Sequence, residues 1–177
     1  MICMQTAFIS PPKKIPVYIR IGIWAARRIT GRDLLPARLL AWYPKAAVSS
    51  GVLEGLIAHR DGQLDERILK MVRMVVSFTA SCPFCMDMNS AGWEELITPD
   101  ELGVLQGRAL FDKVPSLSER ERLAIQYARL VSSTPLSFPA AFVEQLQTHF
   151  NEREIVILAT TAAQVNYWAR LIQALGC

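Results

Sequence analysis

The sequence has no long uncharged apolar run and few metal-binding side chains. Its 177 residues include only two His and four Cys. The most apolar stretch, 155–175, is interrupted by Gln164, Asn166 and Arg170. A membrane-spanning helix needs about 18 continuous apolar residues. The first twenty residues hold prolines and lysines where a secretory signal has its apolar core. We therefore expect a cytoplasmic protein with no membrane partner.

The charge pattern excludes other classes of protein. Nineteen Lys and Arg are spread along the chain and are offset by 16 Asp and Glu, so no basic patch predicts a nucleic-acid partner. A hydrophobic content of 51% with only 20% charged residues excludes disorder for most of the chain. This length and composition predict a single domain over residues 1–177, with residues 1–60 as an accessory helical layer.

No segment alternates with the period of a strand, whereas helical periodicity and capping signals recur, so we predict an all-α fold. Two capping boxes, Thr98 with Glu101 and Ser118 with Glu121, mark helix starts. The predicted helices cover 17–29, 35–41, 46–59, 66–80, 82–96, a segment opening at 99, 119–131, 140–149 and a last helix starting at 151–154.

The helix that opens after Asp65 is amphipathic. One stripe is expected to be buried: Ile68, Met71, Val72, Val75, Val76 and Thr79. A second stripe, on residues three and four apart, holds Glu66, Lys70, Arg73 and Ser77.

Cys82 and Cys85 lie three residues apart at the start of a predicted helix, with Pro83 at the first helical position. One helical turn separates such cysteines by about 5 to 6 Å between Cα atoms, which a reversible disulfide can bridge. Unpaired N–H groups and the helix dipole lower a thiol pKa there, and this favours Cys82 as the more acidic thiol.

Two other interpretations of the pair stay open. It can be half of a zinc site, although the chain offers only His59, His149, Cys3 and Cys177 as further soft ligands. It can also be two small buried apolar side chains. We expect neither a metal nor another cofactor, and Cys3 and Cys177 are expected to be separate thiols near the chain ends.

Three stretches of the chain resemble the carboxymuconolactone decarboxylase family and, within it, the alkylhydroperoxidase D-like branch. They are LDERILKMVRMVVSFTASCPFCMDMNSAGW, LSERERLAIQYARLVS and FVEQLQTHFNEREIVILATTAAQVNYWARLIQALG. The similarity covers about residues 35–176. The resemblance implies an all-helical domain that assembles into homo-oligomers, as trimers or hexamers.

In the peroxidase branch, the resemblance implies that Cys85 attacks a hydroperoxide and that Cys82 resolves the sulfenic acid. A thiol or disulfide reductant then restores the pair. The family pattern also places a Glu twelve residues before the first Cys and a His four residues after the second, as a proton relay. Lys70 and Asn89 occupy these positions here. Because Asn does not titrate and Lys is normally protonated, neither is the expected base.

Four residues are candidates for tuning the site instead. Lys70 can lower a thiol pKa by its charge. Glu66 can reach the site or pair with Lys70 one turn away. Asp87 can act as a carboxylate or only complement the helix dipole. Asn89 can orient a substrate or a water by hydrogen bonds.

We predict a thiol-dependent peroxidase or disulfide oxidoreductase that acts on a small hydroperoxide. Two alternatives are a lyase that decarboxylates a lactone and a non-catalytic oligomer that binds a ligand. Both remain open because a fold does not by itself fix the chemistry.

Overall fold

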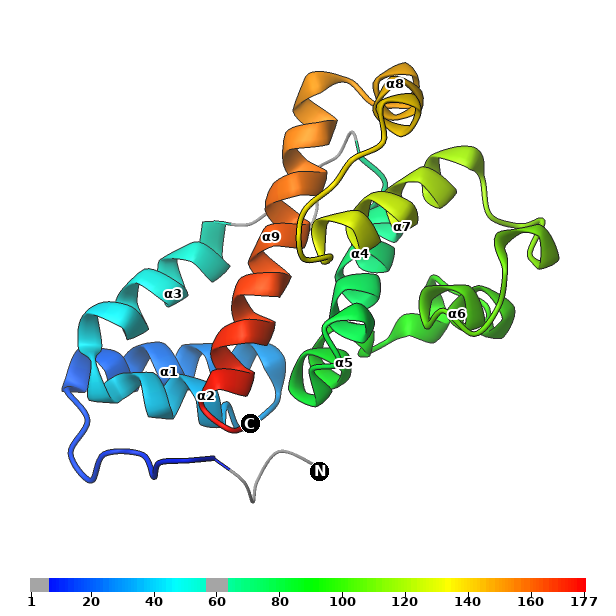
Figure 1. Cartoon of the computed structure of the whole chain (residues 1–177). Coiled ribbons are helices and arrows are strands. Elements are labelled where there is room, and N and C mark those ends of the chain that lie inside the picture. Colours follow the sequence, from blue (N-terminus) through cyan, green and yellow to red (C-terminus); the bar gives the residue numbers. More distant parts are fainter. Residues whose placement is uncertain (1–6, 57–63) are drawn as a thin grey trace. The chain divides into compact units, whose positions relative to one another are not determined.

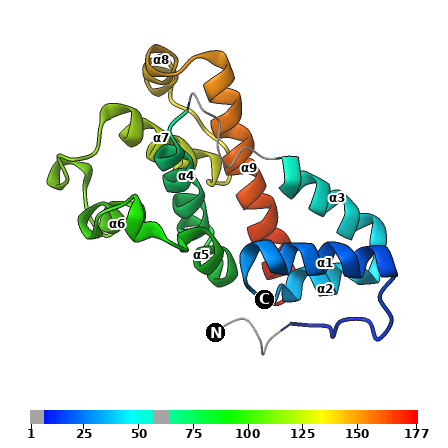
Figure 2. The ribbon, with the colours of Figure 1, turned by 180° about the vertical axis from the view of Figure 1, so that it is seen from behind.

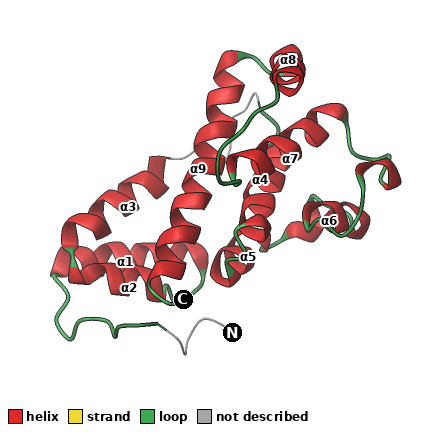
Figure 3. Cartoon of the chain, in the orientation of Figure 1, coloured by secondary structure: helices red, strands yellow, loops and turns green. Residues whose placement is uncertain are grey.

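The computed structural model describes residues 7–56 and 64–177. Within these ranges it is helical and contains no β-strand, which confirms the all-α prediction (Figure 3). The helices, with 3-10 turns labelled η, are α1 (Val17–Thr30), α2 (Leu35–Leu39), η1 (Leu40–Trp42), α3 (Pro44–Leu56), α4 (Glu66–Thr79), α5 (Pro83–Ser90), η2 (Trp93–Glu95), α6 (Pro99–Leu105), η3 (Phe111–Lys113), α7 (Glu119–Val131), α8 (Ala140–His149) and α9 (Glu152–Ala174).

The described residues divide into two compact units. The first holds 7–56 with 171–177, and the second holds 64–170. In the first unit α1 contacts α3, and η1 contacts both α2 and α3 (Figure 2). The Phe8 N–H donates to the Leu175 carbonyl at 2.9 Å, which links the segment before α1 to the C-terminal segment of this unit. The expectation of a single domain over 1–177 stays a prediction.

Helix boundaries in the first unit follow local signals with three differences. Helix α1 ends one residue after the predicted 17–29 and is closed by Gly31, whose φ of 68° suits glycine and whose N–H donates to the Arg27 carbonyl at 2.8 Å. The predicted segment 35–41 is split into α2 and η1. The third helix begins at Pro44 rather than at residue 46. Its predicted end at His59 lies outside the described residues.

Helix α4 is the centre of the second unit and contacts α5, α6 and α7 (Figure 1). Asp65 caps it by accepting a hydrogen bond from the Arg67 N–H at 2.8 Å. The predicted buried stripe is confirmed except at Thr79, which is exposed because α4 ends there. Leu69 and Met74 are also fully buried. Several helices therefore cover α4 on more than one side.

The starts of three helices rest on reciprocal capping, in which a Glu side chain returns to the backbone of the N-cap residue. The pairs are Thr98 with Glu101 for α6, Ser118 with Glu121 for α7, and Asn151 with Glu154 for α9. The first two confirm the predicted capping boxes, and the third confirms the predicted start of the last helix.

Helix α9 is the only described helix long and apolar enough to cross a membrane by length and composition. Yet 44% of its most apolar window is buried inside the structure. Leu158, Ala162 and Val165 belong to the hydrophobic core that α4 and α7 also line. Part of α9 therefore packs into the core of the second unit.

Candidate active site

A tight turn between α4 and α5 places the cysteine pair. The Ser81 N–H donates to the Phe78 carbonyl at 3.0 Å, and the Cys82 N–H donates to the Ser77 carbonyl at 3.3 Å. These two bonds form a Schellman motif, with Ser81 in the left-handed position at a φ of 49°. The residue that closes the end of α4, Cys82, is therefore also the N-cap of α5.

The two cysteines share the first turn of α5. Cys82 Sγ accepts a hydrogen bond from the Cys85 N–H at 3.3 Å, and Pro83 occupies the first turn as predicted. Both thiols are buried, and no disulfide joins them. The predicted extent of this helix, to residue 96, is wrong. It ends at Ser90, because Gly92 takes a left-handed φ of 66° and η2 follows.

The surroundings of Cys82 favour its thiolate. The largest influence is the hydrogen bond from the Cys85 side chain, which lowers the pKa of Cys82. Burial acts in the opposite direction, and the backbone N–H groups of Cys85 and Phe84 lower the pKa further. The net effect takes the pKa of Cys82 from 9.0 to about 7. This agrees with the argument from the helix N-terminus, which favoured Cys82 as the more acidic thiol.

The two substituted relay positions, Lys70 on α4 and Asn89 on α5, each bond across to the neighbouring segment. Asn89 Nδ2 donates to Ser77 Oγ at 2.9 Å. Lys70 Nζ donates to the Ala91 carbonyl, just past the end of α5, at 2.5 Å. The sequence placed Ser77 and Lys70 on one stripe of α4, and these two members of the stripe contact α5 and the residue just past it. The role of Ser77 had no signal in sequence, since its partner lies on another helix.

The Lys70 hydrogen bond goes to the backbone just past α5 and not to a thiol. Burial is the largest influence on Lys70 and lowers its pKa, and Arg73 acts in the same direction. Nearby carboxylates, including that of Glu66, raise it, and the net shift is downward. Glu66 and Asp87 are themselves exposed, at the start of α4 and in the middle of α5. The structure thus links Asn89 to α4 through Ser77 and links Lys70 to the backbone at Ala91.

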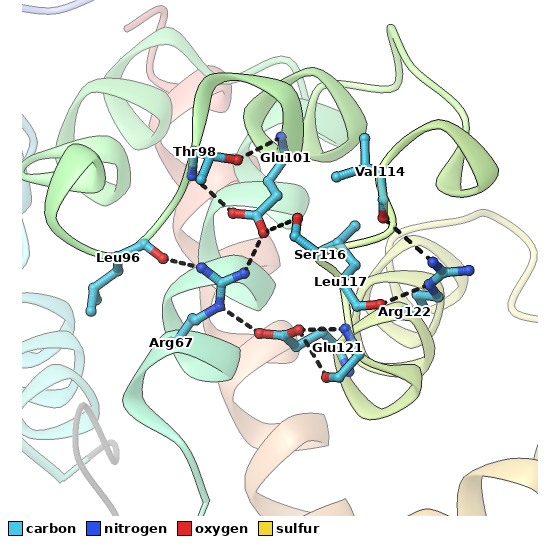
Figure 4. Close-up of polar contacts among 10 residues, drawn as sticks. Arg67, Leu96, Thr98, Glu101, Val114, Ser116, Leu117, Glu121 and Arg122 are labelled. Carbon is cyan, nitrogen blue, oxygen red and sulfur yellow. Dashed lines mark hydrogen bonds and ion pairs between the residues drawn. The ribbon is translucent and has the colours of Figure 1, made fainter.

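A second polar cluster, which the sequence did not reveal, lies at the other end of α4 (Figure 4). Arg67 Nη2 pairs with Glu101 Oε1 at 2.7 Å, and Arg67 Nε pairs with Glu121 Oε1 at 2.5 Å. Its remaining nitrogen donates to the Leu96 carbonyl. Ser116 adds a hydroxyl donor to Glu101 at 2.6 Å. One guanidinium therefore joins the N-terminal capping boxes of α6 and α7.

Glu101 remains ionised in this cluster. Burial is the largest influence and raises its pKa, but hydrogen bonds from Arg67, Ser116 and the Thr98 backbone together outweigh burial. The net effect lowers the pKa of Glu101 from 4.5 to about 2. Arg67 and the Ser118 hydrogen bonds likewise give Glu121 a lowered pKa in spite of its burial. The cluster has the composition of a structural ion network.

The described residues contain no group of three or more His, Cys, Asp or Glu side chains placed to hold a metal ion. Residues 93–99, which come after α5 in the chain, line an open groove of about 420 Å³. Its lining includes Glu94 and Glu95 but neither cysteine of the pair.

Solved structures share this architecture. The structure of a cysteine-to-alanine variant of the debrominase Bmp8 with 2,3,4-tribromopyrrole matches with a TM-score of 0.79 at 16% identity, covering 97% of this chain and 90% of that one. An uncharacterized peroxidase-related protein from Ralstonia eutropha JMP134, described as an alkylhydroperoxidase AhpD core, matches with a TM-score of 0.73 at 18% identity, covering 96% and 90%. At these identities the likeness shows the fold. The protein has the all-α AhpD-like fold, as the resemblance implied.

One curated relative is similar in sequence along nearly the whole chain. The uncharacterized protein YnjA of Escherichia coli (strain K12) is 27% identical over 165 residues, covering 93% of this chain and 90% of that protein. No protein-family model matches the chain.

Proposed function

We propose that the protein is a dithiol oxidoreductase that reduces small hydroperoxides with Cys82 and Cys85. The observation that carries the proposal is the hydrogen-bonded pair itself. The pKa of Cys82 is about 7, so a substantial fraction is thiolate near neutral pH, and Cys85 lies one turn away as the second thiol. A thiol pair at this spacing on an AhpD-like fold supports a redox cycle.

The chemistry balances with a hydroperoxide and an external dithiol. The Cys82 thiolate attacks the terminal peroxide oxygen, the O–O bond breaks, and the alkoxide leaves and takes a proton to become an alcohol. The Cys85 thiol then attacks the Cys82 sulfenic acid, which forms a disulfide and releases water. Two thiols are oxidised while the hydroperoxide is reduced to alcohol and water. A small or protein dithiol restores the pair by thiol–disulfide exchange.

These roles reverse the assignment that the resemblance implies, in which Cys85 attacks. The acidity of Cys82 favours the present order, since the thiolate is the nucleophile. A sulfenic acid persists only where its resolving partner is missing, so single variants distinguish the two orders. We expect a dimedone adduct on Cys82 in Cys85→Ser and little adduct on Cys85 in Cys82→Ser. The opposite pattern reverses the roles.

The experiment that tests the function uses reduced protein and one equivalent of an organic hydroperoxide. After a short reaction, thiols are alkylated and the mass of each peptide is measured. We expect a loss of two hydrogen atoms confined to the Cys82–Cys85 peptide, faster than oxidation of free cysteine. Cys177→Ser is the matched control and is expected to oxidise like the parent. A pair that stays reduced contradicts the proposal.

The lyase alternative receives less support. A lactone carboxylate as substrate needs a cationic or hydrogen-bonding pocket. The groove along 93–99 has no Lys or Arg in its lining and includes Glu94 and Glu95, whose negative charges disfavour a carboxylate. Release of CO₂ from a carboxylated lactone by thiol-alkylated protein would favour the lyase over the peroxidase.

We also propose that copies of this chain associate through α1. Val17, Ile21 and Trp24 form one stripe and are 69%, 61% and 67% exposed. Exposed apolar stripes of this kind mark protein interfaces, and trimers or hexamers are the assemblies that the resemblance implies. Trp24→Glu is expected to lower the sedimenting mass, whereas Ile29→Glu, off the stripe, leaves it unchanged. A parent that sediments as a monomer at micromolar concentration contradicts the proposal.

A further inference from the structure

Ser77 connects α4 to both ends of the cysteine helix. Its carbonyl accepts the Cys82 N–H at 3.3 Å, where α5 begins. Its hydroxyl accepts Asn89 Nδ2 at 2.9 Å, near the end of α5, and donates to the Arg73 carbonyl at 2.8 Å. Ser77 is fully buried, so its hydroxyl is shielded from solvent.

Helix α5 has eight residues, and a helix of that length has little stability of its own. Its orientation therefore depends on its contacts with α4. Cys85 and Asn89 are four residues apart and lie on the same face of α5. Because its N–H bond to the Ser77 carbonyl holds Cys82 on α4, a rotation of the rest of α5 about that point moves the Cys85 N–H away from the Cys82 sulfur, to which it donates at 3.3 Å.

We propose that Ser77 and Asn89 are positioning residues of the dithiol, whose hydrogen bond holds α5 on α4 so that the Cys85 N–H points at Cys82 Sγ. This inference rests on the proposed redox function of the pair. The Ser hydroxyl and the Asn amide do not titrate, so they act by geometry and not by taking a proton. The position that the resemblance gives to a His base thus serves orientation in this chain.

The test measures the acidity of Cys82 in the reduced full-length protein, with no hydroperoxide present. Iodoacetamide alkylation of the Cys82 peptide is followed by mass across pH for the parent, Ser77→Ala, Asn89→Ala and the double variant. Ser90→Ala, next to Asn89 on α5, is the matched control. In each single variant we expect a Cys82 pKa higher by about one unit, which makes alkylation at pH 7 about fivefold slower. Ser90→Ala is expected to match the parent.

The double variant distinguishes a shared hydrogen bond from two separate effects. Because one bond links the two side chains, the Cys82 pKa in the double variant is expected to rise no further than in either single variant. Additive shifts overturn the shared role. Circular dichroism and thermal unfolding verify the fold of each variant. If Ser77→Ala does not fold, Asn89→Ala, at a half-buried position, still tests the proposal.

The two hypotheses fail separately. A Cys82 pKa that is unchanged in folded Asn89→Ala overturns the positioning role, whatever the pair does with hydroperoxide. A parent pair that stays reduced in hydroperoxide, with a Cys82 pKa that still responds to Asn89→Ala, overturns the redox function instead.

Discussion

The two ends of α4 are held to neighbouring helices by different kinds of polar contact. Each end holds a polar side chain that ties α4 to neighbouring helices. At the N-terminal end the tie is ionic, from Arg67 to Glu101 and Glu121. At the C-terminal end it is neutral, from Ser77 to Asn89. The ionic tie joins two capping boxes, whereas the neutral tie lies beside the thiols.

The comparison shows why a neutral hydrogen bond suits the end of α4 that lies beside the cysteines. A carboxylate held near a thiol raises the thiol pKa, because it disfavours a second negative charge. The Ser77–Asn89 bond fixes α5 without adding such a charge. At the distant end, full charges on Arg67 and Glu101 are compatible with function and join α4, α6 and α7 firmly.

The largest expected effect is the loss of stability on removing Arg67 from its cluster with Glu101 and Glu121. Arg67→Met leaves two carboxylates that are at most 9% exposed without their cation. We expect a loss of about 3–5 kcal/mol in the free energy of unfolding, measured by urea denaturation. Arg38→Met is the control, since it removes the pair with Asp33, whose side chains are each 42% exposed. That loss is expected to be about 1 kcal/mol or less. Equal losses in the two variants would contradict the structural role of the cluster.

As pH falls, the ion pairs of Arg67 should weaken before the Ser77–Asn89 hydrogen bond changes, because neither Ser nor Asn titrates. The pKa of Glu101 is about 2 in the fold against an ordinary 4.5, so folding favours its ionised form. That stability is fully present above about pH 4.5 and is lost as pH falls toward about 2. Urea midpoints between pH 2 and 7 measure it, with Glu101→Gln as the comparison. A parent whose midpoint falls no more steeply than that of Glu101→Gln would show that the pKa is not lowered.

A smaller effect is expected at Lys70. Lys70→Met removes the hydrogen bond to the Ala91 carbonyl and is expected to cost about 1 kcal/mol. The pKa of Cys82 should stay near 7, because the Ser77–Asn89 bond still holds α5 on α4 in this variant and the groups that lower that pKa belong to α5. Alkylation of the Cys82 peptide across pH measures this. A clear rise in that pKa would mean that the ammonium of Lys70 acts on the thiol by charge.

The smallest effect is expected in the turn before the cysteines. Ser81 has a φ of 49°, a region that glycine enters with less strain. Ser81→Gly is expected to change the free energy of unfolding by about 1 kcal/mol or less, in the stabilising direction. Ser81→Ala keeps the Cβ atom and serves as the control for the hydroxyl. Thermal unfolding that shows Ser81→Gly below Ser81→Ala would contradict this account of the turn.

The sequence predicted those parts of the fold that depend on neighbouring residues. Capping pairs such as Ser118 with Glu121 connect residues three apart, so their spacing can be read directly. The position of Cys82 and Cys85 at a helix start was found in the same way. The end of α5 was missed, because the apolar pattern continues through Trp93 although Gly92 breaks the helix.

Tertiary structure decided the partners of the polar side chains. Asn89 meets Ser77 twelve residues away, Lys70 meets Ala91 at a separation of 21, and the side-chain partners of Arg67 lie 34 and 54 residues away. No local spacing encodes such contacts, since they depend on which helices pack together. The sequence by itself therefore determined most helix starts and the place of the cysteine pair at one of them. Only the packing of α5, α6 and α7 on α4 decided which side chains hold that pair in place, because helix packing follows the burial of whole apolar faces.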